Sequence, residues 1–428
     1  MSDTTKTKLL LISLRDPFLD NDRVMPPLGI MSLHACALQN GIDSTIENNF
    51  DVDNLEKYRE FTHFGISCMT PQKKQAYAIL HSVKKTFPEK TVIIGGPHAT
   101  HYPGDCVKQS FDYVVTGDGE IALMSIVSGA QGLGRVLDMP VSQAEMNKMP
   151  LPYREPEFLN QYNFFVQGIR STTVLTGKGC PMSCSFCEDA NTRVRLYTSE
   201  NVGRQIVQAK EAGYEGIMFF DDIFTVSLKR VFELAGEIAK HDMIYRCFGH
   251  AKSMSEDMAK LLAGSGCIET GFGAEAGSQK ILDIVNKKTT VAQNYEYVKI
   301  CNRHLIKVKA FIVVGLPGEN WKTIEETQRF LDFLTSKRFL NRFGQEVSND
   351  FDAVIYFPYK GTRIRDSIDQ NKNEFDLYFT SDPDSFSGFY KGKGGEAETT
   401  IRTSALSGND IKNIQKELLL KFKKKVLR

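Results

Sequence analysis

The sequence lacks a net charge, a long apolar run and internal repeats. Its 53 basic residues stand against 52 acidic ones, so it has no global electrostatic footprint for nucleic acid or an anionic membrane. The first apolar run, Leu9 to Leu14, is too short for a signal-peptide core or a membrane span and ends in Arg15-Asp16. We therefore expect a cytoplasmic protein with no membrane span, and no nucleic acid among its partners.

The chain also lacks the cysteine pattern of a disulfide-stabilised domain. Its nine cysteines, an odd number, are scattered along 428 residues without a secretion signal, which favours thiols or metal ligands. With 41% hydrophobic and 25% charged residues, the chain has the composition of a soluble protein with two or three domains. The spacing of the cysteines is therefore more informative than their number.

Short apolar runs alternate with helix-length amphipathic stretches through the first part of the chain. This alternation predicts an α/β, doubly wound (Rossmann-like) domain over residues 1–140. Its strand candidates are KLLLISL, FGIS, TVIIGG and DYVVTG, with helical stretches around residues 29–40 and 75–84. The last three strand candidates end in small or turn-forming residues, at the sheet edge where doubly wound domains bind ligands.

A second α/β region follows an irregular, proline-containing stretch. We interpret residues 141–168 as an interdomain linker. Six strand candidates with helical stretches between them predict a partial (β/α)6 TIM barrel over residues 169–365. The candidates are residues 172–176, 216–220, 244–248, 269–272, 308–314 and 353–357.

Residues 366–428 are expected to form a small C-terminal helical extension. Its last segment places Ile411, Ile414, Leu418 and Phe422 at the spacing of an amphipathic helix. The terminal Lys/Arg cluster is expected to complement the helix dipole, and a tail that binds RNA or a membrane is the alternative. The glycine-rich segment before this helix contains aromatic residues, which form either an ordinary surface loop or a lid over a substrate: Phe386, Phe389 and Tyr390.

Three cysteines directly follow the first strand of the predicted barrel. Cys180, Cys184 and Cys187 therefore belong to a loop at the carboxyl end of the barrel, where catalytic groups cluster. Three thiolates within eight residues suit an iron–sulfur cluster or zinc. Three ligands on a four-iron cluster leave one iron open, as a catalytic metal requires.

Zinc is the alternative to an iron–sulfur cluster. A structural zinc site needs a fourth ligand, and the sequence near the three cysteines supplies none. Cys247, His250 and Cys267, on later strands or loops, are the remaining candidates for that ligand.

The spacing C-x-x-x-C-x-x-C, with Phe186 before the last cysteine, resembles the signature of the radical S-adenosylmethionine (SAM) enzymes. The resemblance implies a [4Fe–4S] cluster whose open iron chelates SAM. Reduction by one electron would then yield a 5′-deoxyadenosyl radical that abstracts hydrogen from a small-molecule substrate. It also implies an external one-electron reductant, such as flavodoxin or ferredoxin, and a contact between Phe186 and adenine.

Two later stretches, residues 271–278 and 311–319, resemble the loops after the fourth and fifth strands of the same family. The resemblance places Glu275 near the ribose of SAM, with Ser278 in the same cofactor-binding loop, and Gly315 beside the adenine. A charge at a helix N-terminus is the alternative role for Glu275.

The paired carboxylates Asp221 and Asp222 resemble the end of the second strand in cobalamin-type members of the family. The resemblance implies that they bind substrate or cofactor, and capping of the next helix is the alternative. Arg246, on the third strand, points either into the barrel toward a carboxylate or into a structural ion pair.

The loops of the first domain resemble the cobalamin-binding domain that precedes the radical module in one subfamily, the class B radical SAM methyltransferase-like enzymes. Glycine-rich strand ends leave a flat shelf on which a corrin ring can lie. The D-x-H-x-x-G motif that supplies a lower axial histidine in other cobalamin proteins is missing, so either cobalt has no histidine ligand or the domain has lost cobalamin. Hydrogen bonding to the backbone of a turn is the alternative role for His98. The residues implied to contact cobalamin are Ser67, Thr70, Gly95, Gly96, His98, Gly117 and Gly119.

Three functions are consistent with these features. The coexistence of both modules favours transfer of a methyl group from methylcobalamin to an unactivated carbon or phosphorus centre. A second hypothesis keeps the cluster but replaces methyl transfer with cyclisation, rearrangement or aminocarboxypropyl transfer. The third is a scaffold without catalytic activity that binds zinc or cobalamin.

Overall fold

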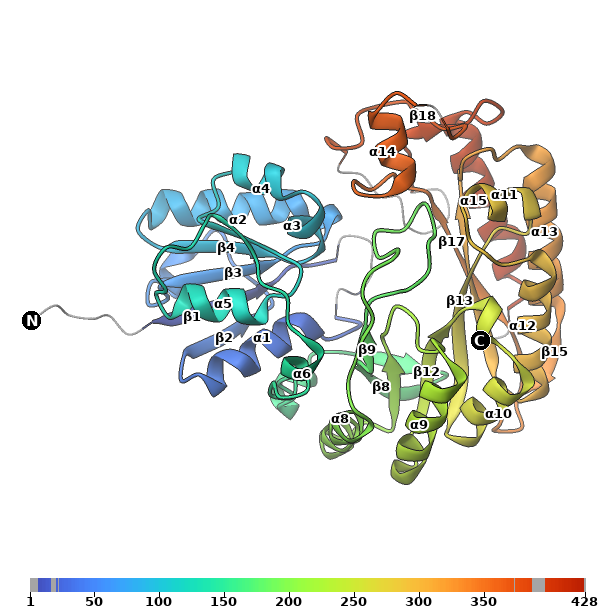
Figure 1. Cartoon of the computed structure of the whole chain (residues 1–428), viewed down its shortest axis with the longest axis horizontal. Coiled ribbons are helices and arrows are strands. Elements are labelled where there is room, and N and C mark those ends of the chain that lie inside the picture. Colours follow the sequence, from blue (N-terminus) through green and yellow to red (C-terminus); the bar gives the residue numbers. More distant parts are fainter. Residues whose placement is uncertain (1–6, 17–20, 22, 373, 387–396, 427–428) are drawn as a thin grey trace, which may run out of the picture. The chain divides into compact units, whose positions relative to one another are not determined.

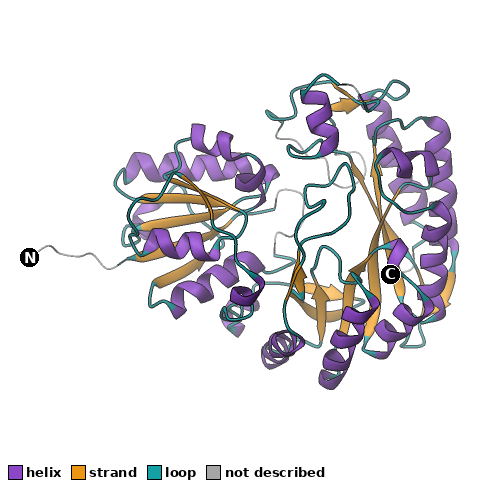
Figure 2. Ribbon diagram, in the orientation of Figure 1, coloured by secondary structure: helices purple, strands orange, loops and turns teal. Residues whose placement is uncertain are grey.

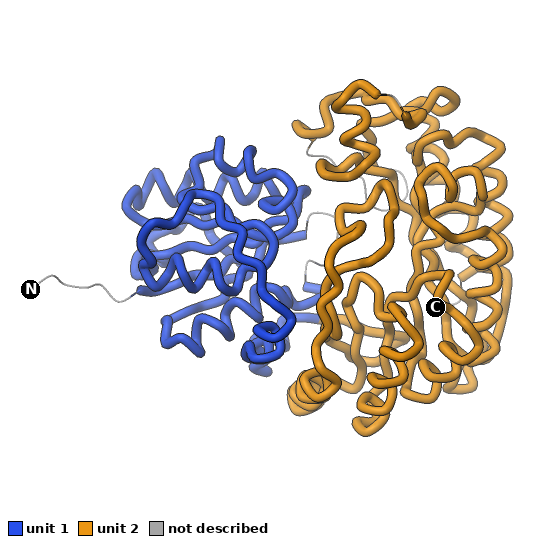
Figure 3. Tube along the Cα trace, in the orientation of Figure 1, with its two compact units in different colours: residues 1–162 blue, residues 163–428 orange. Residues whose placement is uncertain are grey.

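The computed structural model describes residues 7–16, 21, 23–372, 374–386 and 397–426. The chain divides into two compact units, Met1–Tyr162 and Asn163–Arg428 (Figure 3). Both units combine helices with a central sheet (Figure 2). Phe389 and Tyr390, from the predicted loop or lid, lie outside the described residues. Within the described ranges, no helix has the length and apolar character needed to cross a membrane.

The first unit is built on a six-stranded parallel sheet with the order β2-β1-β3-β4-β5-β6. Helices cover both faces of the sheet, so the predicted doubly wound domain is confirmed (Figure 1). The strand order reverses between β1 and β3, and ligands of such sheets bind at the carboxyl edge of that reversal. The strands are β1 (Lys8–Ser13), β2 (Asp43–Glu47), β3 (His63–Ser67), β4 (Thr91–Gly95), β5 (Tyr113–Thr116) and β6 (Val136–Asp138).

The core of the first unit lies on both faces of this sheet. Leu10 and Ile12 of β1 pack with α2 (Lys73–Thr86), α3 (Pro97–His101) and α4 (Pro103–Lys108). Leu9 and Leu11, which alternate with them, pack with α1 (Leu28–Gln39) and α5 (Glu120–Val127) on the opposite face. Strands buried on both faces read as continuous apolar runs, which is why the sequence pattern revealed β1, β3, β4 and β5.

Residues interpreted as linker contribute to both units. Tyr153 donates its backbone N–H to the carbonyl of Met31 (3.1 Å), so this stretch lies against α1 of the first unit. In the second unit, β7 (Phe164–Val166) pairs antiparallel with β8 (Ile169–Val174) through the two-residue turn Gln167-Gly168. Both turn residues have positive φ, as tight hairpins require.

The second unit is a curved seven-stranded sheet with the order β17-β14-β13-β12-β11-β8-β7. Six of its strands are parallel and correspond to the six predicted strands, so the partial barrel is confirmed. These strands are β8 (Ile169–Val174), β11 (Gly216–Phe219), β12 (Ile244–Gly249), β13 (Cys267–Glu275), β14 (Lys307–Val314) and β17 (Asp350–Ile355).

Amphipathic helices line the outside of this sheet (Figure 1). They are α8 (Ser199–Glu211), α9 (Leu228–Ile238), α10 (Glu256–Gly264), α12 (Val291–Arg303), α13 (Trp321–Ser336) and α15 (Gly408–Lys423). The predicted C-terminal helix is α15, and it buries the four expected apolar side chains. Gln415 of this helix donates to the carbonyl of Ala353 (3.1 Å), which anchors α15 on β17. Lys423, in its last turn, forms ion pairs with Asp350 and Asp352.

Short elements complete the described chain. They are α6 (Gln143–Met146), α7 (Pro156–Leu159), α11 (Gln279–Ile284), α14 (Arg363–Asp369), β9 (Gly177–Lys178), β10 (Arg195–Leu196), β15 (Arg338–Leu340), β16 (Glu346–Ser348), β18 (Tyr378–Phe379), β19 (Ile401–Arg402) and the 3-10 turns η1 (Leu55–Tyr58), η2 (Thr70–Gln72), η3 (Ala239–His241) and η4 (Ala251–Ser253).

Candidate active site

The three motif cysteines lie on the loop that leaves the carboxyl end of β8. Cys180, Cys184 and Cys187 all line one cavity of about 370 Å³ within the second unit. Burial raises the pKa of each thiol, to about 12 for Cys187, so the thiols need a positively charged partner to act as thiolate ligands. Three sulfur donors around one cavity fit an iron–sulfur cluster.

The paired aspartates at the end of β11 hold this cysteine loop. Asp221 is buried and accepts hydrogen bonds from the backbone N–H of Thr176 (2.7 Å) and from its hydroxyl. Asp222 accepts the N–H of Gly179 (2.8 Å), one residue before the first cysteine. The helix-capping alternative is wrong, because the hydroxyl of Ser227 caps the following helix. Burial raises the pKa of Asp221 to about 6.

The other side of the cysteine loop is held by backbone contacts. Ser185 donates its N–H to the carbonyl of Val285 (2.9 Å) and accepts the N–H of Ile364 (3.1 Å). The side-chain amide of Asn286 donates to the carbonyl of Ser183 (2.7 Å). The loop is thus fixed by β11, by the segment after α11 and by α14.

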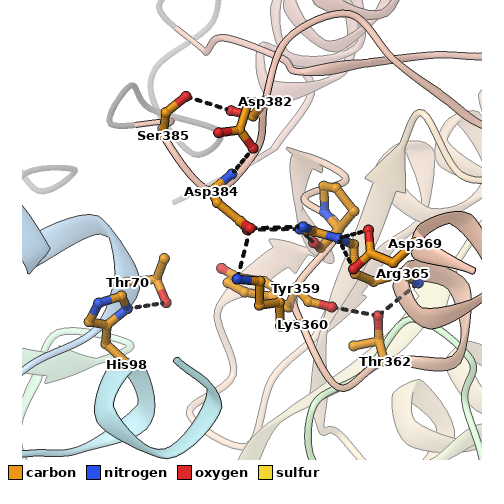
Figure 4. Close-up of polar contacts among 11 residues, drawn as sticks. Thr70, His98, Tyr359, Lys360, Thr362, Arg365, Asp369, Asp382, Asp384 and Ser385 are labelled. Atoms are coloured by element: carbon orange, nitrogen blue, oxygen red, sulfur yellow. Dashed lines mark hydrogen bonds and ion pairs between the residues drawn. The ribbon is translucent and has the colours of Figure 1, made fainter. Parts of the chain in front are cut away.

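A buried arginine anchors α14. Arg365 donates to the carboxylates of Asp369 and Asp384 and to the carbonyl of Pro358. Lys360 also pairs with Asp384 (2.8 Å), and Figure 4 shows both cations facing this carboxylate. The helix that contacts the cluster loop is therefore itself tied to the C-terminal extension.

A buried ion pair lies beside the thiols. Glu275, the last residue of β13, accepts a hydrogen bond from Lys287 Nζ (2.7 Å), and both side chains are 8% exposed. A Cβ at Gly273 would lie 2.0 Å from Glu275 Oε1, so only glycine leaves room for the pair. Burial lowers the pKa of Lys287, but Glu275 and the thiols of Cys184 and Cys187 outweigh it, and the net shift is upward.

No sequence pattern indicated that Lys287 or the aromatic wall would line the cavity. Lysine side chains usually lie in solvent. No feature of the sequence distinguishes the buried Lys287 from its exposed neighbour Lys288. The aromatic wall combines Phe186, which was predicted, with Phe220 directly after β11 and with side chains of β12, β13 and β14: Phe248, Phe272 and Phe311. Such a wall gives the space beside the cysteines an apolar side, although Phe220 is itself 46% exposed.

The remaining predicted cofactor-binding residues of the barrel lie outside the lining of the cavity. Arg246 forms an ion pair with Glu269 of the neighbouring strand (3.3 Å). This contact is the structural ion pair that was the alternative to a side chain pointing into the barrel. Ser278 is fully buried at the start of α11. Gly315 has a φ of +87°, and its N–H donates to Glu319 (2.6 Å). Burial raises the pKa of this glutamate to about 8.

The candidates for a fourth zinc ligand are not brought together at the cysteines. Of the three, His250 lines the cavity. Cys247 is fully buried in the wall of the barrel, and the thiol of Cys267 donates to the carbonyl of Glu269 (3.3 Å).

In the first unit, the predicted corrin contacts cluster on the loops after β3, β4 and β5. Gly96 has a φ of +89°, and a Cβ there would lie 2.9 Å from the backbone nitrogen of Cys68. At these positions, small residues therefore leave the edge of the sheet without large projecting side chains, which fits a flat ring. The members of the group are Ser67, Thr70, Gly95, Gly96, His98, Gly117 and Gly119.

The imidazole of His98 is engaged inside the first unit. It is 1% exposed, and its Nε2 lies 2.8 Å from the hydroxyl of Tyr77. Its Nδ1 lies 3.4 Å from the hydroxyl of Thr70 (Figure 4). These contacts are with side chains rather than with a turn backbone. Both ring nitrogens of His98 therefore lie near hydroxyl groups of the first unit.

Comparison with known proteins connects these two sites to known domains. Residues 174–331 match the radical SAM superfamily, and residues 22–127 match the B12 binding domain. An uncharacterized methyltransferase of Pyrococcus horikoshii is 25% identical, over 79% of this chain and 77% of its own length. An anaerobic magnesium-protoporphyrin IX monomethyl ester cyclase of Rubrivivax gelatinosus is 24% identical, over 62% of this chain and 53% of its own length.

Solved structures share the fold. The radical S-adenosylmethionine methyltransferase TsrM from Kitasatospora setae, solved with cobalamin and a [4Fe-4S] cluster, superimposes with a TM-score of 0.68. The match covers 88% of this chain and 81% of that one, at 15% identity. The cobalamin-dependent radical enzyme OxsB matches with a TM-score of 0.65 and 14% identity, over 86% of this chain and 56% of that one.

Proposed function

We propose that this chain, which belongs to the cobalamin-binding radical SAM enzymes, transfers a methyl group to an unactivated carbon or phosphorus centre of a small molecule. The presence of both cofactor domains on one chain carries the proposal. The alignment with a methyltransferase over 79% of the chain supports it.

The two domains identify the cofactors as a [4Fe–4S] cluster, SAM and cobalamin. When bound, the cluster and SAM supply a 5′-deoxyadenosyl radical, and cobalamin supplies the methyl group. We assign Cys180, Cys184 and Cys187 as cluster ligands, with Asp221 and Asp222 fixing the loop that carries them. The aromatic wall gives the space beside the cysteines an apolar lining. Radical SAM enzymes take their electron from an external reductant, and we propose a flavodoxin or ferredoxin for this chain.

Residues around the cysteines are proposed to bind SAM. They are Phe186 and Glu275, which line the cavity of the cysteines. Ser278 and Gly315, which the family resemblance also places at SAM, lie outside the lining of that cavity. For cobalamin we propose the small residues at the sheet edge of the first unit, with Ser67 supplying a hydroxyl for the corrin amides. His98 would support that edge from within the unit, through Thr70.

Radical cyclisation is the second candidate function. The cyclase of Rubrivivax gelatinosus aligns with 62% of this chain, so a protein of similar sequence is named for a cyclisation. A cyclase would use the cluster and SAM without transferring the methyl group of SAM.

The experiment separates these functions by following the methyl group. The enzyme is purified anaerobically, reduced, and incubated with SAM labelled in its methyl group. Methyl transfer predicts 5′-deoxyadenosine together with label in the corrin fraction, and 5′-deoxyadenosine is expected to disappear in Cys184→Ala. Formation of 5′-deoxyadenosine with no label on the corrin would favour the cyclase alternative. Zinc without iron would reject both enzymes in favour of a scaffold.

A further inference from the structure

The three cysteines lie on a loop whose two ends pair with each other. The short strands β9 and β10 form an antiparallel hairpin at the base of this loop. The two ends approach closely there, because a Cβ at Gly177 of β9 would lie 2.9 Å from Cδ2 of Leu196 on β10. Just outside the hairpin, Tyr197 donates its backbone N–H to the carbonyl of Thr176 (3.0 Å). All three cysteines therefore lie between Thr176 and Tyr197, on the cysteine loop (residues 177–196).

Arg230, in the first turn of α9, bridges the two ends of the cysteine loop. Its Nη2 donates to the carbonyl of Thr176 (3.1 Å) and to the carbonyl of Tyr197 (2.6 Å). Its side chain is 8% exposed, so water competes little for these two acceptors. Hydrogen bonds from a charged donor are stronger than those between neutral groups. One guanidinium nitrogen therefore holds together the two residues that flank the cysteine loop.

Thr176 is also bound by Asp221. The buried carboxylate accepts the N–H and the hydroxyl of Thr176, while the carbonyl of Thr176 accepts from Arg230. Burial lowers the pKa of Arg230, and the negative charges of Asp221 and Glu233 oppose that shift. Glu233 is 46% exposed and lies 3.9 Å from the guanidinium, so it contributes little as an ion-pair partner. Asp221 and Arg230 therefore attract each other across the start of the cysteine loop.

The stability of α9 does not explain an arginine at this position. A positive charge in the first turn of a helix is unfavourable, because it opposes the helix dipole. Burial of an arginine is also costly unless the side chain is paired. Both carbonyls that Arg230 binds belong to the residues that flank the cysteine loop. A residue that goes against the preferences of its own helix is expected at functional sites, and here its contacts are with the loop.

We propose that Arg230 is a positioning residue for the iron–sulfur cluster, which joins Thr176 to Tyr197 and so keeps the three cysteines directed at one cluster. Residues that orient metal ligands through hydrogen bonds typically change metal affinity by about 10- to 100-fold when they are lost. The inference rests on the assignment of the three cysteines as cluster ligands, and it does not depend on methyl transfer.

Two substitutions of Arg230 and one control separate closure of the loop from the stability of α9. Arg230→Gln removes the charge and shortens the side chain, so the two carbonyls lose their shared donor. Arg230→Lys keeps a positive charge and three N–H donors on a long side chain, so it is the conservative variant. Leu234→Ala is the matched control, because Leu234 is 0% exposed on the same helix and its truncation removes apolar packing but no hydrogen bond.

The assay reconstitutes the cluster anaerobically in the full chain. It measures iron and sulfide per chain, the EPR spectrum of the reduced cluster, and the rate at which a chelator removes iron. We expect Arg230→Gln to release iron about tenfold faster than wild type or more, with shifted EPR g values. We expect Arg230→Lys to recover part of that loss. Leu234→Ala should release iron within about threefold of wild type, with an unchanged EPR spectrum.

Gly177→Ala provides a second test that leaves Arg230 intact. Its Cβ would separate the two strands at the base of the loop, so we expect faster release of iron and shifted g values here as well. An unchanged spectrum and rate in Gly177→Ala would overturn the proposal. Equal effects of Arg230→Gln and Leu234→Ala would also overturn it, because Arg230 would then only stabilise α9.

Failure of the cluster assignment gives a different result. Wild-type protein that assembles no iron–sulfur cluster would reject both this proposal and the proposed function. A wild-type cluster that Arg230→Gln retains as firmly would reject the role of Arg230 alone. Label transfer by the wild-type enzyme is the same in that case, so methyl transfer is tested separately.

Discussion

The ion pair between Glu275 and Lys287 gives a stability prediction with a defined size. Lys287→Met leaves a buried carboxylate without the ammonium that lies 2.7 Å away. Removing one partner of a buried ion pair costs about 3–5 kcal/mol, whereas neutral replacements for both partners are often tolerated. We therefore expect Lys287→Met and Glu275→Gln each to lower the free energy of unfolding by about 3 kcal/mol or more. The double variant should lose less than the sum of the two.

The chain offers a local probe for this experiment. Its single tryptophan is Trp321, at the start of α13, so tryptophan fluorescence reports on the second unit alone. Urea unfolding of the cluster-free protein would be followed by this signal, with Lys288→Met as control for an exposed neighbouring lysine. The control should change stability by less than about 0.5 kcal/mol. The account of a buried ion pair would be refuted if each single substitution lowered the free energy of unfolding by less than about 1 kcal/mol and the two losses were additive in the double variant.

Three further predictions concern the surroundings of the site. Gly273→Ala should destabilise the second unit by about 2 kcal/mol or more, because its Cβ would displace the ion pair. The control is Gly236→Ala, in open space on α9, which should stabilise the second unit by about 0.5–1 kcal/mol in the same urea assay. Glu319 keeps its proton when folded up to a pKa of about 8 and loses it near 4.5 when unfolded. Stability relative to Glu319→Gln should therefore fall by about 2–3 kcal/mol as the pH rises from 5 to 7, and a pH-independent difference would contradict the burial of this acid. Asp222→Asn should lower iron retained after gel filtration at unchanged secondary structure by circular dichroism, because the N–H of Gly179 loses a charged acceptor; full iron retention would contradict the loop-holding role.

The sequence predicted the apolar strands, including the edge strand β17, and missed the edge strands β2, β6 and β7. The six barrel strands and four strands of the first unit are apolar runs with helical stretches between them. By contrast, β2 reads DSTIE, and β6 and β7 have three residues each. An edge strand needs little apolar character, because one side of it has no neighbouring strand.

Some parts of the candidate site are formed by residues close together in the sequence, and others by residues that lie far apart. The three cysteines form a local motif, which the sequence displays directly. The contact between Thr176 and Asp221 joins residues 45 positions apart. The pair of Glu275 and Lys287 depends on the course of the chain through α11, which lies between them. His250 was considered as a zinc ligand, but the orientation of its ring proton is set by the backbone of Lys252, which no sequence pattern reveals.

The central claim is that one chain carries both a catalytic iron–sulfur cluster and a corrin. The direct measurement is quantification of iron, acid-labile sulfide and corrin in anaerobically purified wild-type protein, beside the Cys184→Ala variant. We predict one [4Fe–4S] cluster and one corrin per chain in the wild type, and loss of the cluster with retention of the corrin in the variant. Wild-type protein that contains zinc in place of iron, or that binds no corrin when supplied with cobalamin, would contradict the claim.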